Sequence, residues 1–344
     1  MTTINALKLD FCSGLMICDE ERTWHLRQKL NSIEKIKSLI PPVIQTEQGT
    51  VARLGTTGTC SIGAEILRGC RIKLQNMYSE KTEKLGKKPD FFLTVEEISN
   101  IIFEYMIEVK HRHVDELLLA KYGFVTKDFI RGYYMSGEKK IEIKDKEIIK
   151  GAEEMITWSK KSSELNKILG NGAIVAGYDS KEGFNIFHLS LSKGRIEPVP
   201  FIFRMDGSGR DVSEIRYNDY VDRKSLRKRR DNLNPVEAMV MMLEAFVHCR
   251  RIAIGVGGWP DIIYINGREK DNDKKVKEID DERAKLATEI IDASCTGEFF
   301  PRKTCYDLIE ELVFNDGDFE TVHLKMWRSV ANPVMLSRFL RGHK

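Results

Sequence analysis

The sequence has little that is typical of a secreted, membrane-bound or nucleic-acid-binding protein. No apolar run approaches the roughly twenty residues that a membrane-spanning helix needs. Lys8 and Asp10 interrupt the one apolar stretch that lies early enough to serve as a signal peptide. The 55 Lys and Arg residues are nearly balanced by 52 Asp and Glu residues, and the net charge of +3 indicates neither a nucleic acid nor a membrane surface as partner. We therefore expect a cytoplasmic protein.

The sequence also lacks the usual patterns of metal and disulfide sites. Its 7 cysteines include no Cys-x-x-Cys pair, and their odd number favours reduced, mostly buried thiols. His111 and His113 stand two residues apart and would lie on different faces of a helix, so they make a poor metal site. We expect no metal and no cofactor. The basic run at 223–230 has no interleaved aromatic residue, which favours a solvated loop or a subunit contact over nucleic-acid binding.

What is present begins at the N-terminus, where two strands are predicted within residues 2–19, joined by a turn at 10–14. Thr2 directly follows Met1. If Met1 is removed, Thr2 carries both a hydroxyl nucleophile and an α-amine, whose reference pKa of about 7.7–8.0 lets it accept the hydroxyl proton. The alternative is that a small residue after Met1 indicates only that the methionine is trimmed.

Further strands and helices follow along the chain. We predict a short strand within 33–40, ended by Pro41 and Pro42, and a strand from Val51 that leads through a glycine-rich turn into a helix from about Ser61. The capping box that begins at Thr94 opens a helix to about residue 119. The remaining predictions are a hairpin of strands at 173–179 and 184–191, one strand at 195–204, a helix from Asn234, and a strand after the glycine-rich loop near 255–258.

This order of elements predicts an α+β protein. It fits a four-layer αββα sandwich, in which two antiparallel sheets are stacked face to face and flanked by helices. We divide the chain into a core at 1–267 and a C-terminal helical extension at 268–344. An insertion at about 124–167 interrupts the core, with an exposed strand near 139–146 and a helix over 148–168. Helices are also expected near 281–293 and 304–313.

At this level the sequence resembles a proteasome-type β-subunit of the N-terminal nucleophile (Ntn) hydrolases. The bacterial ATP-dependent peptidase subunit of this family likewise begins Met-Thr-Thr-Ile, and the resemblance covers most of residues 2–267. It implies a threonine peptidase that assembles into a homo-oligomeric ring. It further implies peptides or unfolded proteins as substrates and an ATPase unfoldase as partner.

The resemblance also assigns five site residues. Thr2 matches the nucleophile, and Asp19 matches the aspartate that orients a lysine. Lys35 best matches that lysine, which would lower the pKa of the threonine amine; Lys37 is the alternative. Gly58 matches the glycine whose N–H forms the oxyanion hole, and Ser208 matches the serine near the amine.

Two other functions stay open. The family's Asp-x-x-Ser-Gly-Gly stretch reads here from Ala253 to Gly258, with Ala253 in place of the aspartate and Val256 in place of the serine. This departure favours a catalytically silent structural or interaction subunit with the same fold. A phosphate-binding loop at 55–63 is a weaker alternative, because it lacks the lysine of a nucleotide-binding loop.

Overall fold

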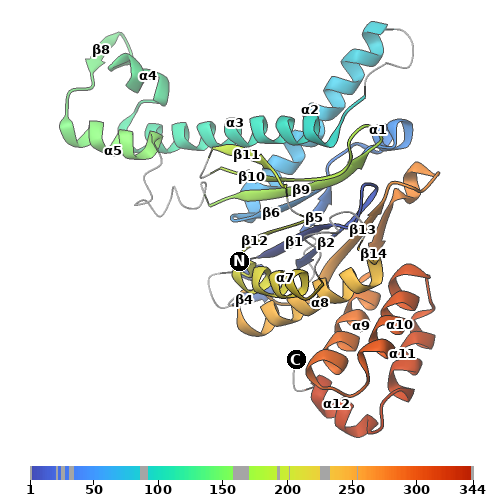
Figure 1. Ribbon diagram of the computed structural model, residues 1–344. Coiled ribbons are helices and arrows are strands. Elements are labelled where there is room, and N and C mark those ends of the chain that lie inside the picture. The colour runs from blue at the N-terminus through green and yellow to red at the C-terminus, as the bar shows by residue number, and fades with distance from the viewer. Residues whose placement is uncertain are drawn as a thin grey trace.

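The computed structural model describes residues 2–20, 22–24, 28–30, 35–85, 92–157, 170–191, 194–200, 202–224, 233–253 and 255–341. It has the predicted α+β composition (Figure 1), with helices packed against antiparallel sheets. Met1, part of the basic run and part of the helix predicted at 148–168 lie outside these residues. Among the residues that are described, no helix has the length and apolar character needed to cross a membrane.

The first sheet holds the N-terminal strand pair at its centre. β1 (Thr3–Lys8) and β2 (Ser13–Asp19) are antiparallel, as predicted, and Ile4 lies opposite Cys18. At the turn, the Asp10 carboxylate accepts the backbone N–H groups of Cys12 and Ser13. The sheet order is β12-β1-β2-β13-β14, with β12 at Phe203–Gly207, β13 at Pro260–Asn266 and β14 at Val276–Ile279. The sequence analysis missed β14.

The second sheet contains the predicted hairpin. Its order is β11-β10-β9-β6-β5, with strands β11 (Arg195–Pro198), β10 (Gly183–Ser190), β9 (Gly172–Asp179), β6 (Val51–Thr57) and β5 (Ile36–Ser38). The single strand predicted at 195–204 is wrong, because β11 belongs to this sheet and β12 to the first. Pro198 and Pro200 lack the N–H groups that a continuous ladder needs, so the chain leaves one sheet there and joins the other.

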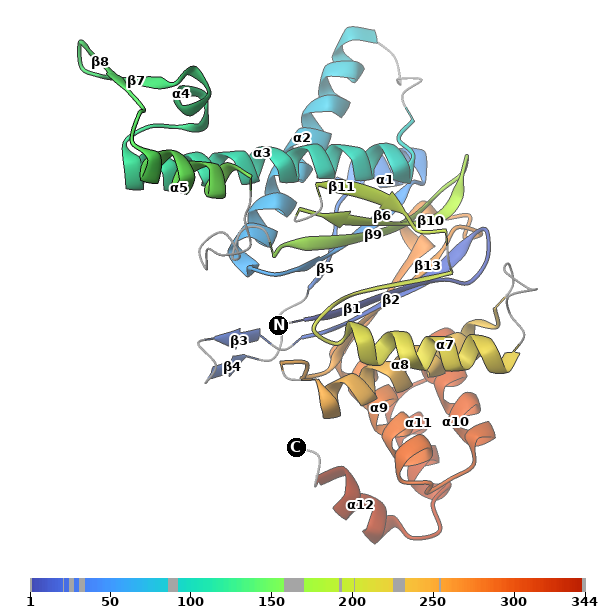
Figure 2. The same cartoon turned by 60° about the vertical axis from the view of Figure 1, so that its left-hand side comes forward.

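Helices cover the outer faces of both sheets (Figures 1 and 2). α2 (Cys60–Leu85) and α3 (Val95–Tyr122) pack on the second sheet. The capping box is present: the Thr94 side chain accepts the Glu97 N–H, and the Glu97 carboxylate accepts the Thr94 N–H. α7 (Arg210–Lys224) and α8 (Pro235–Ile252) cover the first sheet. α8 begins as predicted, with the Asn234 side chain accepting the Glu237 N–H, whereas α7 was not predicted.

A third core fills the space between the sheets. Ile4 and Met16 of the first sheet pack there with Ile174 and Phe184 of the second. At Gly14 a Cβ atom would lie 2.1 Å from the Phe184 ring, so this close approach of the sheets requires glycine. Because β1 is paired on both sides, with β12 and β2, and its residues enter this core, the residues that follow Thr2 are held firmly.

Residues 124–157 form an arm that projects from the body of the molecule (Figures 1 and 2). It contains α4 (Thr126–Arg131), β7 (Tyr133–Ser136), β8 (Lys139–Glu142) and α5 (Lys146–Ile156). A separate small core holds it together, made by Val114, Leu118, Phe124, Ala152 and Met155. The exposed strand predicted at 139–146 is therefore found as β8, and the helix predicted at 148–168 is described as far as Ile156.

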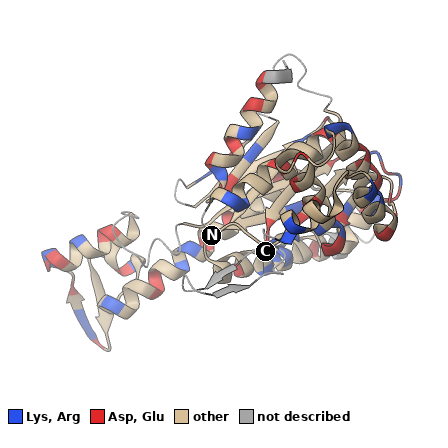
Figure 3. Ribbon diagram, turned by 90° about the horizontal axis from the view of Figure 1, so that it is seen from below, with Lys and Arg blue, Asp and Glu red and all other residues tan. Residues whose placement is uncertain are grey.

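Residues after 267 form β14 and then helices. These are α9 (Asp281–Ile291), α10 (Arg302–Ile309), α11 (Phe319–Arg328) and α12 (Pro333–Arg341), with π-helical turns at Asp292–Thr296 and Glu310–Phe314. Their apolar residues join the same core as α8. Three short elements complete the description: α1 (Pro42–Gln48) and the paired strands β3 (Arg22–Trp24) and β4 (Gln28–Leu30). Basic and acidic residues are interspersed along the helices (Figure 3).

Candidate active site

Thr2 lies just before β1 and is held through its backbone. Only 7% of the residue is exposed. Its carbonyl oxygen accepts two hydrogen bonds from Ser208, one from the backbone N–H at 2.7 Å and one from Oγ at 3.2 Å. The structure thus brings Ser208 against Thr2, although 206 positions separate them. Both hydrogen bonds from Ser208 are made to the carbonyl oxygen of Thr2.

Asp19 joins two parts of the candidate site. It ends β2 and is fully buried. Its Oδ1 atom accepts the Thr3 N–H at 2.8 Å, and its Oδ2 atom lies 2.9 Å from Nζ of Lys35. The carboxylate therefore ties the Lys35 ammonium to the backbone beside Thr2. This ion pair belongs to Lys35, while the alternative, Lys37, lines the cavity next to Thr2.

The ion pair and burial act on Asp19 in opposite directions. Burial raises the pKa of the Asp19 carboxyl, because the charged form loses hydration. The Lys35 ammonium and the N–H groups of Thr3 and Gly257 lower this pKa, without fully offsetting burial. Lys35 thus favours the ionised form of Asp19, and the Lys35 side chain in turn is only 8% exposed.

Gly58 lies at the same cavity and cannot be replaced by another residue without strain. Its φ is +100°, and a Cβ atom there would lie 2.6 Å from Oδ1 of Asn171. The cavity has a volume of about 230 Å³. It is lined by Thr2, Lys35, Lys37, Leu54, Thr56, Thr57, Gly58, Thr59, Cys60, Gly63, Ala64 and Leu67. Three of the five predicted site residues therefore face one space large enough for a side chain.

Asp206 also lies beside these candidate residues, and no sequence pattern predicted its place there. Its Oδ2 atom accepts a hydrogen bond from Oγ1 of Thr57 at 2.8 Å, and its Oδ1 atom accepts the Gly207 N–H at 2.9 Å. Thr57 precedes Gly58 and Gly207 precedes Ser208, so Asp206 fixes two predicted site residues relative to each other. Burial raises the pKa of Asp206, but hydrogen bonds from His188 and Thr57 outweigh it and leave the pKa below its ordinary value.

The glycine-rich loop contributes its backbone near Asp19. Ala253 is the C-cap of α8, and its backbone N–H donates a hydrogen bond to the Cys249 carbonyl. Val256 is buried in the core that α8 forms with the first sheet. Neither offers a polar side chain. The Gly257 N–H reaches the Asp19 carboxylate. This loop therefore supports Asp19 through its backbone.

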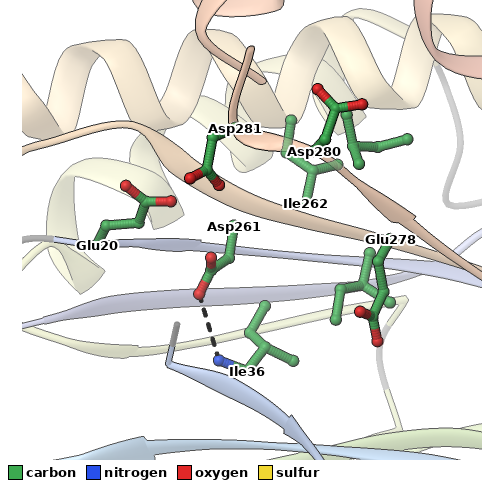
Figure 4. A pocket seen from close by; sticks show the side chains of 9 residues that line it. Glu20, Ile36, Asp261, Ile262, Glu278, Asp280 and Asp281 are labelled. Carbon is green, nitrogen blue, oxygen red and sulfur yellow. Dashed lines mark hydrogen bonds between the residues drawn. The ribbon is translucent and has the colours of Figure 1, made fainter. Parts of the chain in front are cut away.

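An acidic hollow of about 420 Å³ begins at Ile36, the residue after Lys35 (Figure 4). It is lined by Glu20, Ile36, Asp261, Ile262, Ile263, Glu278, Ile279, Asp280 and Asp281. Burial, followed by the negative charges of Asp261 and Asp281, raises the pKa of Glu20 to about 7. No sequence signal marked this hollow, because its residues come from distant segments.

The described residues contain no group of three or more His, Cys, Asp or Glu side chains suited to a metal ion. His113, one of the two histidines considered above, has its ring nitrogens 3.0 Å from carboxylate oxygens of Glu65 and Glu116. His188 lies in β10 and is buried, and its Nε2 atom lies 3.7 Å from Oδ2 of Asp206.

Comparison with solved structures shows the fold. The chain is similar to a Gly-1 mutant of Anbu from Hyphomicrobium sp. strain MC1, with 14% identity over 87% of this chain and 98% of that one, and a TM-score of 0.50. Anbu from Yersinia bercovieri, described as an ancestral β-subunit, gives 11% identity, coverages of 86% and 96%, and a TM-score of 0.49. No protein-family model and no curated protein matches the sequence. The chain therefore has a fold like that of Anbu.

Proposed function

We propose that this protein is a threonine-type amide hydrolase that uses Thr2 as its nucleophile once Met1 has been removed. The observation that carries the proposal is the position of Asp19, whose carboxylate holds the Lys35 ammonium and the Thr3 N–H at the same time. A buried cation beside a free α-amine lowers the pKa of that amine and so favours its role as base.

The proposed reaction is acyl transfer to Thr2. The α-amine takes the proton of the Thr2 hydroxyl while Oγ attacks the carbonyl carbon of a peptide bond. The Gly58 N–H stabilises the oxyanion, a contribution of a few kcal/mol when such a donor is well placed. The C–N bond then breaks, the proton passes to the leaving amine, and the acyl group remains as an ester on Thr2. Water hydrolyses the ester and regenerates Thr2.

We further propose a four-layer αββα sandwich over residues 1–267, with an insertion at about 124–167 and a C-terminal extension at 268–344. The proposed assembly is a homo-oligomeric ring in the cytoplasm that receives peptides or unfolded proteins, with an ATPase unfoldase as partner. Its support is the fold shared with Anbu from Hyphomicrobium sp. strain MC1 and the order of the candidate site residues along the chain.

A second candidate function is a structural subunit without activity. Ala253 and Val256 favour it, because neither side chain can hydrogen-bond the Thr2 amine. In that case Asp19 and Lys35 serve as a buried ion pair, and the arm and the C-terminal helices serve as docking surfaces.

Intact-mass analysis of the purified protein, with and without a threonine-directed β-lactone, separates these functions. The hydrolase predicts loss of Met1 and one added probe mass that is absent from the Thr2→Ala variant. A Ser208→Ala variant is a useful second sample, because it removes only the side-chain hydroxyl at position 208. Thr2 and the backbone N–H at position 208 are kept. Retained Met1, or hydrolysis by the Thr2→Ala variant, would contradict the hydrolase. A trimmed but unlabelled protein would favour the structural subunit.

A further inference from the structure

We propose that Asp261 is a positioning residue, whose carboxylate fixes the backbone at Lys35 so that the Lys35 ammonium stays on Asp19 beside Thr2. The inference deepens the proposed function and rests on it, because Lys35 matters for chemistry only if the Thr2 amine is the base. Asp261 lies outside the five residues assigned by resemblance.

One oxygen atom of Asp261 accepts from several donors. Its Oδ2 atom lies 2.6 Å from the Lys35 backbone nitrogen, 3.5 Å from that of Ile36 and 3.3 Å from Sγ of Cys18. Figure 4 shows the carboxylate pointing from β13 toward Ile36. A hydrogen bond from an N–H to an ionised carboxylate is about twice as strong as one between neutral groups. The contact to Lys35 is the shortest of the three.

This contact crosses between the two sheets. Asp261 lies on β13 of the first sheet, directly opposite Cys18 of β2, whereas Lys35 leads into β5 of the second sheet. The next position along the ladder pairs Pro260 with Asp19. Asp261 and Asp19 therefore hold Lys35 from adjacent positions, one at its backbone and one at its ammonium.

The local structure explains why such an anchor is needed. β5 has three residues and is the last strand of its sheet, paired with β6 through Ile36, Lys37 and Ser38. Lys35 lies just before this short edge strand. A lysine side chain has many rotamers, so an ammonium that must stay on a buried carboxylate needs a fixed backbone.

The charged groups around Asp261 decide in which direction the pKa of the Thr2 α-amine should shift when Asp261 is replaced. The charged and titratable groups that face it are Glu20 after β2, Glu278 on β14, Asp281 on α9, Lys35 and Cys18. Removing one carboxylate from this group acts through space to lower the pKa of a nearby amine. Displacing the Lys35 ammonium raises that pKa. The two effects have opposite directions, so the sign of the shift identifies the role.

The first measurement is the pKa of the Thr2 α-amine. The full chain is prepared with Thr2 exposed by cleavage of an N-terminal fusion, and the rate of α-amine labelling by acetic anhydride is followed against pH. For Asp261→Ala we expect the amine pKa to rise by about half a unit or more. Asp281→Asn is the matched control: it removes a carboxylate of the same hollow, and we expect no rise. A lowered or unchanged pKa in Asp261→Ala would overturn the proposal.

The second measurement is the rate of Thr2 acylation by the β-lactone. We expect Asp261→Ala to slow acylation by about ten- to a hundredfold, because a misplacement of about 1 Å in a catalytic group can cost about a hundredfold in rate. In a Lys35→Ala background the same change should have no further effect, because its action passes through Lys35. If the two substitutions instead reduce the acylation rate independently, so that their effects multiply, Asp261 does not act through Lys35 and the proposal is overturned.

Two further comparisons keep the outcomes apart. If Asp261→Ala does not fold, Asp261→Asn can be used instead, because it keeps the shape of the side chain and one acceptor oxygen. For this variant we expect a smaller rise in the pKa of the Thr2 amine. A fall in that pKa would contradict the positioning role. If the wild-type chain is not acylated, the hydrolase proposal fails. The amine titration still decides whether Asp261 positions Lys35, because it needs no activity.

Discussion

Asp19 is a buried carboxylate whose charge is balanced by one lysine. Removing one member of a buried ion pair leaves the other charge unpaired, at a cost of about 3–5 kcal/mol. We expect Asp19→Asn to lower the free energy of unfolding by about 3 kcal/mol in urea titrations, because Lys35 is left without its counter-charge. The double variant Asp19→Asn/Lys35→Met should recover part of this loss. A single variant as stable as the wild type would contradict this account.

Glu20 makes stability depend on pH near neutrality. Its pKa in the folded protein is about 7, above the ordinary 4.5. For a carboxyl group with a raised pKa, the stabilisation is complete below the unfolded pKa and is lost as pH rises through the folded one. We expect Glu20→Gln to be more stable than the wild type at pH 8 by on the order of 1–2 kcal/mol, allowing for water in the hollow. At pH 4.5 the difference should largely vanish, which denaturant titrations at both pH values can check.

The five candidate residues assigned by resemblance could be picked out from the sequence because each belongs to a conspicuous local pattern, such as a strand end or a glycine turn. Their anchors could not be read from the sequence. Thr57 and Asp206 are 149 positions apart, and Lys35 and Asp261 are 226 apart. Which side chains meet at such separations depends on strand register and on how the two sheets stack.

Among the structural elements, the turn that carries Gly58 is constrained twice, by its backbone conformation and by Asn171. Gly123, the C-cap of α3, provides a matched control because its φ is +79° and no atom would lie within 4 Å of an added Cβ. We expect Gly123→Ala to cost about 1 kcal/mol and Gly58→Ala at least twice as much, with loss of β-lactone labelling. Equal costs in denaturant titrations would show that Asn171 adjusts freely.

Several elements with strong local signals were predicted, and several with weak local signals were missed. α3 has a capping box and a long apolar periodicity, and the hairpin of β9 and β10 has two apolar runs around a turn. α7 has a mostly polar sequence and becomes a helix through its packing on α8 and the first sheet. β14 is a short edge strand of mixed composition, stabilised by pairing with β13. Tertiary contacts outweigh local preference in both elements.

For the molecule as a whole, the arm and the C-terminal helices differ in how they join the body. The arm has its own small core, whereas α9 and α10 share one with α8. We expect replacement of residues 124–156 by a short Gly-Ser linker, with Val114 and Leu118 made polar, to leave cooperative thermal unfolding intact. Removal of residues 302–344 should abolish it, because the core residues of α8 and α9 would be exposed to water. The reverse result would contradict this division.

The α+β composition followed from the order of strands and helices, since each has one apolar face to bury. The order of elements did not predict that the chain crosses from the second sheet to the first between residues 198 and 203. Two prolines stop a strand, but they do not say which sheet the next strand joins.

α3 belongs to two cores at once. Its first half, through Val109, packs on the second sheet, while Val114 and Leu118 belong to the arm. A small core opens at lower free energy than a large one, so amide hydrogen exchange should divide this continuous helix into a slow half and a fast half. The boundary should lie between Val109 and Val114. One end of the helix is then held by the second sheet, which carries Gly58, and the other end is held only by the small core of the arm. A force applied to the arm, such as that of a bound partner, would be transmitted along α3 to this sheet.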